Sequence, residues 1–294
     1  MADDEWLAER FEDHRAHLRA VAYRMLGSLA EAEDAVQEAW LRLSRTDSDE
    51  IDNLGGWLTT VVGRVCLNVL RARRTHPEEP LEARVPDPVV RPASATDPEQ
   101  QALLADSVGL ALLVVLDTLA PPERLAFVLH DMFAVPFEDI APIVGRTPTA
   151  ARQLASRARR RVQHAEATSD PDLGRQWAVV DAFLAASREG DFEALLALLD
   201  PDVTLRADRG TGRPGAVQVV RGARAVLEQA ATFARVTTSV RPALVNGAPG
   251  AVADFDGTPQ AVSSFTIRNG RITGIDLLAG PRLRRLYPTM PDGL

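Results

Sequence analysis

The sequence predicts a multidomain protein in which two all-α domains are followed by an α+β domain. Residues 5–75 and 99–166 carry apolar side chains at helical spacing. Between them, residues 76–98 contain six prolines, so we expect a linker without regular structure there. From Leu173 onward the pattern changes to a mixture of helices and alternating strand-like runs, which we assign to a third domain at 173–286. A chain of 294 residues is long enough for three such domains.

Three helices are expected in the first domain. The first covers residues 5–26 and ends before Gly27, and the acidic residues that follow favour a new helix start. The second covers 31–43 and the third 54–74. One side of the second helix is apolar and should face the core: Ala32, Ala35, Val36, Ala39, Trp40 and Leu43. Cys66, in the apolar run of the third helix, should be buried.

Residues 136–162 predict a helix-turn-helix. A short helix at 137–144 is followed by Gly145, a residue that tolerates positive φ. Thr147 is a good N-cap, and Pro148 favours the first position of a second helix. Helical patterns at 99–119 and 123–133 precede this motif in the second domain. In a helix-turn-helix the second helix enters the major groove of DNA.

The second helix of this motif has an apolar side and a basic side. The inward positions are Ala151, Leu154, Ala155, Ala158 and Val162. Between Gly145 and Ala165 there are six arginines and no acid, although the chain has a net charge of −8. A DNA phosphate backbone would account for such a basic strip. The alternative is an ordinary helical hairpin with a solvated basic face.

The last domain reads as α+β. Helices are expected at 173–188, 192–199 and 222–233. Strand-like runs occur at 203–207, 217–220, 237–245, 251–255, 262–267 and 271–277. Asn269-Gly270 stands between the last two runs and predicts a tight hairpin turn. Helices followed by mostly antiparallel strands are typical of the α+β class.

Composition excludes several kinds of site. A single cysteine rules out an intramolecular disulfide and a cysteine metal cluster, and the five histidines show no ligand spacing. We therefore expect no metal, no cofactor and no catalytic residue. No signal peptide or membrane-length apolar run is visible, so we expect a cytoplasmic protein without a membrane partner.

Three motifs resemble parts of extracytoplasmic-function sigma factors of the sigma-70 family. The segment with which sigma-2 domains dock on the β′ coiled coil of RNA polymerase resembles EAEDAVQEAWLRL, residues 31–43. The segment that opens and reads the −10 element resembles GWLTTVVGRVCLNVLRARR, residues 56–74. The sigma-4 domain, which reads the −35 element and touches the β flap, resembles LAPPERLAFVLHDMFAVPFEDIAPIVGRTPTAARQLASRARRRV, residues 119–162. The C-terminal third resembles the SnoaL-like cone fold, which is fused to sigma factors of one subgroup.

The resemblance implies a sigma factor that binds core RNA polymerase and promoter DNA, with a C-terminal domain that modulates it by contacting the sigma domains, the linker or polymerase. The residues expected at the −35 element are Arg146, Thr147, Thr149, Arg152, Gln153, Ser156, Arg157, Arg160 and Arg161. Those expected at the −10 element are Trp57, Arg64, Asn68, Arg71, Arg73 and Arg74. Those expected to bind core polymerase are Asp34, Gln37, Glu38 and Leu41. Trp57 could stack on a base or belong to the core, and the acidic face of 31–43 could simply be solvated.

The sequence departs from the subgroup pattern at several positions. Pro142 lies inside the first helix of the helix-turn-helix. The stretch ADRGTG, residues 207–212, has fewer glycines than the subgroup loop, and the C-terminal signature is weak in AGPRLRRL, residues 279–286. A tryptophan common in the subgroup's linker is absent from residues 75–88. These departures concern the regulatory contacts.

Two other function classes stay open at this stage. One is a stand-alone, ligand-responsive helix-turn-helix regulator that never joins polymerase, although such a protein has no need of the motifs at 31–74. The other is a SnoaL-like enzyme, which needs a positioned acid or base in its pocket. No histidine follows His164, and Asp276 is the best single acid. The C-terminal domain could also be a small-ligand sensor.

Overall fold

The chain folds into two compact units. The computed structural model describes residues 2–46, 51–75, 84–93, 109–165, 169–211, 216–234 and 239–289. The first unit combines residues 1–78 and 115–166, and the second combines residues 79–114 and 167–294. The segment between the two helical domains therefore belongs with the C-terminal domain. No described helix is long and apolar enough to cross a membrane.

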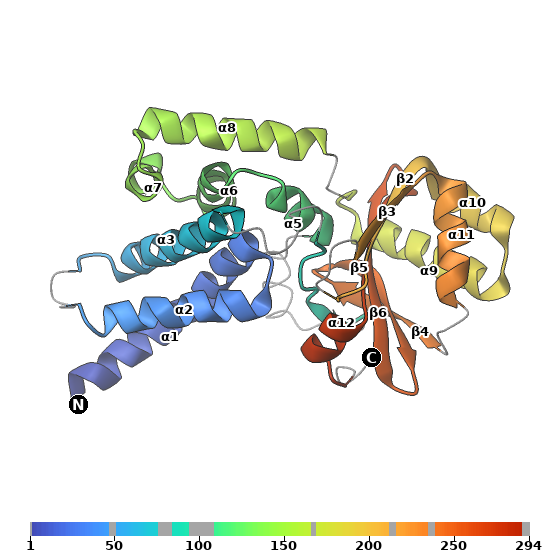
Figure 1. The fold of residues 1–294 in the computed structure, drawn as a ribbon, viewed down its shortest axis with the longest axis horizontal. Coiled ribbons are helices and arrows are strands. Elements are labelled where there is room, and N and C mark those ends of the chain that lie inside the picture. Colours follow the sequence, from blue (N-terminus) through green and yellow to red (C-terminus); the bar gives the residue numbers. More distant parts are fainter. Residues whose placement is uncertain are drawn as a thin grey trace. The chain divides into compact units, whose positions relative to one another are not determined.

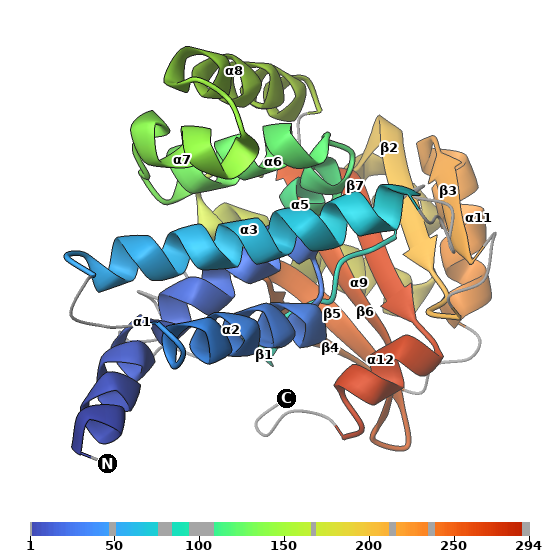
Figure 2. The same cartoon turned by 60° about the vertical axis from the view of Figure 1, so that its left-hand side comes forward.

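The first three helices of the first unit pack against one another (Figures 1 and 2). They are α1 (Ala2–Leu26), α2 (Leu29–Leu43) and α3 (Leu54–Thr75). Ser28 caps α2, because its side chain accepts a hydrogen bond from the Glu31 N–H. The predicted apolar stripe of α2 faces the core, with Trp40 half-buried and the other five residues buried. Cys66 is fully buried, as expected.

A second group of helices completes the first unit. They are α6 (Pro121–Phe127), the π-helical turn η2 (Val128–Met132), α7 (Phe137–Val144) and α8 (Pro148–His164). The expectation of one regular helix over 123–133 is therefore wrong in its second half. The wider turn accompanies a stacking contact of His130 on Phe137, with ring centroids 3.8 Å apart. Of the helix expected at 99–119, α5 (Leu110–Asp117) is present, and residues 99–108 lie outside the described part of the chain.

The helix-turn-helix is confirmed. Gly145 ends α7 with a φ of 67°, and the Thr147 side chain accepts a hydrogen bond from the Ala150 N–H at the start of α8. Pro148 occupies the first turn of α8. Pro142 lies on the exposed side of α7. There, the hydrogen bond that its missing N–H removes can be replaced by water.

The second unit is built on one seven-stranded sheet (Figure 1). Its order is β1-β4-β5-β6-β7-β2-β3. The strands are β1 (Val90–Pro92), β2 (Leu199–Asp208), β3 (Val217–Arg221), β4 (Ser239–Val245), β5 (Ala248–Phe255), β6 (Thr258–Arg268) and β7 (Arg271–Ala279). Among the strand pairs of the described residues, only β2–β7 is parallel. The Asn269-Gly270 hairpin is confirmed, with φ values of 52° and 73°.

Helices cover one face of this sheet and form the core with it. They are α9 (Leu173–Glu189), α10 (Phe192–Leu198) and α11 (Ala223–Ala234). Val180 and Phe183 of α9 pack with Phe265 and Ile267 of β6 in this core. A short helix, α12 (Pro281–Leu286), follows the last strand. This is the α+β architecture that the sequence predicts.

The proline-rich segment is a correction to the sequence analysis. We expected no regular structure in residues 76–98, but Val90–Pro92 form strand β1 and pair antiparallel with β4. Pro92 is compatible with this pairing because β1 is an edge strand, where a missing N–H need not interrupt the sheet. Helix α12 was not predicted either, because six residues are too few to show helical periodicity.

Candidate nucleic-acid interface

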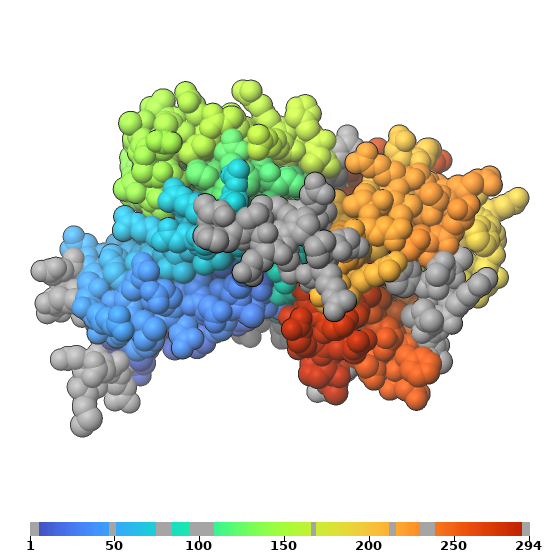
Figure 3. Space-filling view, in the orientation of Figure 1, coloured from blue at the N-terminus to red at the C-terminus, as the bar shows by residue number. Residues whose placement is uncertain are grey.

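Helix α8 presents a polar face to the outside. Ala151, Ala155 and Ala158 are fully buried, and they lie on one side of the helix. The opposite side carries exposed residues at helical spacing, with Ser156 half-buried among them: Thr149, Arg152, Gln153 and Arg160. In Figure 3 the side chains of this green helix form a continuous outer surface of the first unit. All five residues are among those predicted at the −35 element from the sequence.

The flanking arginines of α8 are held by acids from other helices. Both carboxylate oxygens of Glu123 accept hydrogen bonds, one from Arg157 Nε and one from Arg161 Nη1, each at 2.8 Å. The Glu123 side chain is 8% exposed, so these two ion pairs compensate an almost buried charge. On the other flank, Arg159 Nε donates to Asp131 at 2.8 Å. Arg157 and Arg161, both predicted at the DNA, thus lie beside the exposed face and not at its centre.

Two further predicted residues lie at the beginning of the recognition helix. Arg146 is exposed in the turn, and its N–H donates to the Ala141 carbonyl. The Thr147 hydroxyl acts as the N-cap, so its role is at least partly structural. Arg152 lies over the Phe137 ring, 5.2 Å from its centroid, which orients the guanidinium along the exposed face. A helix N-terminus with an exposed arginine favours phosphate nearby.

One face of α3 brings together most of the predicted −10 residues. Arg64, Asn68 and Arg71 recur at helical spacing and are exposed, as is Arg74. Arg73 differs: it is half-buried, pairs with Glu31 and donates to the Leu26 carbonyl at 3.3 Å. Arg73 therefore joins α3 to the junction of α1 and α2.

Trp57 is half-buried at the beginning of α3. It lines a hollow of about 730 Å³ together with His14, His17 and Phe133. The side chain is thus neither fully in the core nor fully open to solvent. A hollow beside an aromatic ring is compatible with the stacking role considered above.

The predicted polymerase surface lies on the outer side of α2. Asp34, Gln37 and Leu41 are exposed, opposite the apolar stripe. Glu38 is half-buried and accepts a hydrogen bond from Arg42 Nε at 2.9 Å. Leu41 is 40% exposed, so an apolar side chain stands beside the acids on the outer side of α2.

A buried arginine that we did not predict connects the two helical groups. Arg124 of α6 is 1% exposed. Its Nε and Nη2 donate to the Arg24 carbonyl of α1, at 3.2 and 3.1 Å, and its Nη1 donates to Asp117 at 2.7 Å. Burial lowers the pKa of Arg124, and Asp117 opposes that shift. In the sequence, only its position within an apolar run could have indicated that Arg124 is buried.

Comparison with known proteins identifies the family. Residues 10–76 match Sigma-70 region 2, and residues 109–162 match Sigma-70, region 4. The ECF RNA polymerase sigma factor SigJ of Mycobacterium tuberculosis is 39% identical over 301 residues, which cover 95% of this chain and 96% of the relative. The chain belongs to the ECF RNA polymerase sigma factors.

Other relatives support the same assignment for this sigma factor. The probable ECF RNA polymerase sigma factor SigI of Mycobacterium tuberculosis is 34% identical over 281 residues, 96% of each chain. The crystal structure of Mycobacterium tuberculosis SigJ superimposes with a TM-score of 0.76 at 36% identity, covering 96% of this chain and 100% of that one. The protein is thus an alternative sigma factor that directs transcription, and the expected membership of the sigma factors is confirmed.

The C-terminal domain of the sigma factor binds the segment that connects its two sigma regions. We call residues 84–92 the linker segment. Arg282 of α12 pairs with Asp87 of this segment and with Asp208 at the end of β2. All three side chains are less than 10% exposed. The Tyr287 hydroxyl donates to the Pro88 carbonyl at 2.7 Å. Charge pairing, hydrogen bonds and strand pairing therefore fasten the linker segment.

Asp276, the acid that a SnoaL-like enzyme would be expected to use, is already paired with an arginine. Asp276 of β7 is 3% exposed and pairs with Arg206 of β2. Burial raises the pKa of Asp276, and the Arg206 guanidinium opposes that shift. Within the described residues there is also no group of three acids, histidines or cysteines that could hold a metal ion. A paired acid of this kind is better suited to holding two strands together than to proton transfer.

Proposed function

We propose that this sigma factor reads the −35 element with α8, contacts the −10 region with α3, and catalyses no reaction itself. The observation that carries the proposal is the exposed polar face of α8, which lies opposite its buried alanines. On that face, Arg152 and Gln153 have the bidentate chemistry that reads guanine and adenine. Arg160, Arg161 and Arg146 are assigned to phosphates, which position the helix without specifying sequence.

The same proposal assigns partners to the other faces. The outer side of α2, with Asp34, Gln37, Glu38 and Leu41, binds the β′ coiled coil of core RNA polymerase, and the sigma-4 region contacts the β flap. On α3, Arg64, Asn68 and Arg71 grip the separated −10 strand, with Trp57 as a stacking surface. Most of these residues are exposed along single helix faces, which supports this assignment, whereas Glu38 and Trp57 are half-buried. Polymerase and promoter are cytoplasmic, and we place the protein there.

We assign residues 5–75 to the sigma-2 domain, 76–98 to the linker, 99–166 to the sigma-4 domain and 173–286 to the regulatory domain. The C-terminal domain modulates activity by controlling the linker. Support comes from the linker segment, which is held by buried ion pairs and a strand pairing within the second unit. A domain that holds the linker limits how far the two sigma regions can separate along a promoter.

In-vitro transcription with core polymerase tests the proposal. The template is a fragment of the source genome that the full chain selects from a library. We expect the full chain to support promoter-specific transcripts, a chain ending at residue 168 to give an altered amount, and a chain ending at residue 150 to give none, because it lacks most of α8. Unchanged output from the chain ending at residue 168 would refute the regulatory role.

A pull-down separates polymerase binding from DNA binding. The Asp34→Asn/Leu41→Ala variant should retain less core polymerase than the parent chain, whereas Asp13→Asn, an exposed acid on α1, should retain as much. Equal retention by both variants would show that polymerase binds elsewhere. Failure to retain core polymerase by the parent chain itself would contradict the whole proposal.

A further inference from the structure

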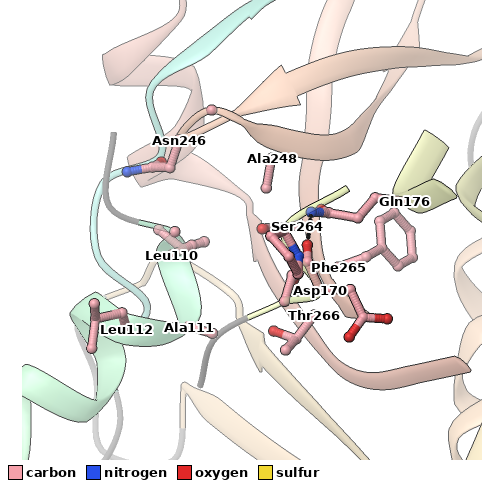
Figure 4. Close-up of a pocket in the computed structure, with 14 residues that line it drawn as sticks. Leu110, Ala111, Leu112, Asp170, Gln176, Asn246, Ala248, Ser264, Phe265 and Thr266 are labelled. Atoms are coloured by element: carbon pink, nitrogen blue, oxygen red, sulfur yellow. Dashed lines mark hydrogen bonds between the residues drawn. The ribbon is translucent and has the colours of Figure 1, made fainter. Parts of the chain in front are cut away.

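The sheet of the C-terminal domain has a gap at one edge of β6. Pairing of β5 with β6 ends at Gly250 and Ser264. Farther along β6, the Asp170 N–H donates to the Ile267 carbonyl at 2.7 Å. Phe265 lies between these two partners of the strand. A pocket of about 330 Å³ opens at this place, and Figure 4 shows the residues around it.

The gap leaves a main-chain acceptor in the pocket. Residues two apart on a strand direct their N–H and C=O groups to the same side. Since the Ile267 carbonyl faces the Asp170 segment, the Phe265 carbonyl faces the same edge. The residue that continues the register opposite Phe265 is Pro249. Proline has no N–H, so the ladder cannot supply a donor to the Phe265 carbonyl.

A side-chain acceptor lies beside it. Gln176 of α9 is 6% exposed, and its Nε2 donates to the Asp170 main-chain carbonyl at 2.5 Å. This bond fixes which end of the amide is the nitrogen, because a carbonyl can only accept. Its Oε1 is buried and has no partner among the described residues. Buried polar atoms are rarely left unpaired in proteins, so this oxygen calls for a donor.

The rest of the lining restricts what could supply that donor. Of the described residues that line the pocket, Asp170 is the only one with a charged side chain. The apolar surface comes from Leu110 and Leu112 of α5 and from Ala248 of β5. Hydroxyl groups of Ser169, Ser264 and Thr266 also line the pocket and can either donate or accept. The Asp170 charge and the two acceptors described above therefore decide the preference: they favour N–H donors and disfavour anions. The volume is at the lower end of the range for small-molecule sites.

We propose that this pocket binds a small molecule with an N–H-rich planar head, an amide or an amidine, and a short apolar body. The head donates to the Phe265 carbonyl and to Gln176 Oε1, and the body lies against Leu110, Leu112 and Ala248. The Phe265 side chain belongs to the hydrophobic core formed with α9, and the pocket uses the main-chain carbonyl of the same residue. Because the wall includes α5, the ligand touches the helix with which the match to sigma region 4 begins.

Binding of three related probes to the full chain tests the proposal. Benzamidine, benzamide and benzoate share one apolar ring and differ in the head. Calorimetric titration should give measurable binding of benzamidine or benzamide, and at least about tenfold weaker binding of benzoate, the loss expected when hydrogen bonds are replaced by repulsion. A stronger response to benzamidine assigns the head as a cation, and a stronger response to benzamide assigns it as neutral.

Two variants locate the site. Gln176→Leu should weaken the better probe about tenfold, and Ala248→Trp should abolish binding by filling the pocket. Gln218→Leu, an exposed glutamine of β3 in the same domain, should bind as the parent does. Ala248→Trp serves alone if Gln176→Leu does not fold. Benzoate binding as tight as the others, binding by the Ala248→Trp variant, or no binding of any probe would each overturn the proposal. None of these readouts depends on promoter recognition.

Discussion

Arg282 donates from its Nε to the carboxylate of Asp87, a residue 195 positions earlier in the chain, at 2.9 Å. The same guanidinium donates from Nη1 to Asp208 at 3.0 Å. One arginine thus pairs with two buried acids, one from the linker segment and one from the sheet. The attraction is strong only while all three groups remain together, because each buried charge alone would be costly.

Replacing Arg282 by methionine should release the linker segment. The change removes the guanidinium that pairs with two buried acids, and breaking a buried pair in this way typically costs about 3–5 kcal/mol of stability. We expect faster hydrogen exchange at residues 84–92 and a lower urea midpoint for the full chain. Exchange measured by mass spectrometry and a urea titration check this.

Arg285→Met is the matched control for that variant. Arg285 lies on the same short helix but is exposed, so its loss should change neither the urea midpoint nor the exchange of residues 84–92 by a measurable amount. Equal protection of the linker segment in the Arg282 and Arg285 variants would show that strand pairing alone holds it.

Local chemistry made the helix-turn-helix predictable, because Gly145, Thr147 and Pro148 each have one dominant structural use. The strand of the linker segment was not predictable for the opposite reason. Its partner β4 lies some 150 residues away in sequence, and nothing local signals a long-range pairing. Within the candidate site, helical spacing gave the exposed face of α8, but the Glu123 pairs depend on how α6 packs.

The requirement for glycine at position 210 could not be predicted from the sequence either. The loop at 207–212 has fewer glycines than the related subgroup loop, which placed its contacts in doubt. In the structure, Gly210 has a φ of 62°, and a Cβ there would lie 2.5 Å from the Ala279 carbonyl oxygen. The glycine is therefore retained where the chain approaches another strand end, and this requirement is visible only in three dimensions.

Gly280 should tolerate a side chain less well than Gly257. Both have positive φ, 79° and 75°. A Cβ at Gly280 would lie 2.2 Å from the Arg209 carbonyl oxygen, whereas at Gly257 there is nothing within 4 Å. Gly257→Ala should cost about 1–2 kcal/mol from the backbone conformation alone, and Gly280→Ala should cost more. Urea unfolding of both variants checks this. Equal losses of unfolding free energy would mean that the main chain at Arg209 can move away from the new Cβ at little cost.

The stability of the first unit should fall at alkaline pH because of Cys66. Burial raises the pKa of its thiol to about 12 from an ordinary value of 9.0. The folded state therefore favours the protonated thiol, and the unfolded state loses its proton first. The stabilisation is complete below about pH 9 and decreases up to about pH 12, by about 1.4 kcal/mol for each pH unit at most.

Urea unfolding near pH 8 and near pH 10 measures this effect. Cys66→Ala should lose part of the difference between the two values, since alanine does not titrate. The chain contains no lysine and only two tyrosines, so few other groups titrate in this range. An identical pH dependence in the parent and the variant would show that the thiol does not contribute.

Replacing Arg152 or Arg160 by alanine should weaken DNA binding with different dependence on the DNA sequence. Arg152 lies on the exposed face over Phe137, where we propose that it reads a base of the −35 element. Its loss should weaken binding to the promoter by about 1–3 kcal/mol, and binding to unrelated DNA much less. The loss of Arg160, which we assign to a phosphate, should weaken binding to both DNAs alike and reduce the slope of log K against log salt concentration by about 1.

The control is Arg175→Ala, which replaces an exposed arginine of α9. Fluorescence anisotropy on promoter and scrambled duplexes at several salt concentrations gives all these quantities. If Arg152→Ala weakens both duplexes equally, the residue holds a phosphate and α8 reads the promoter with other side chains.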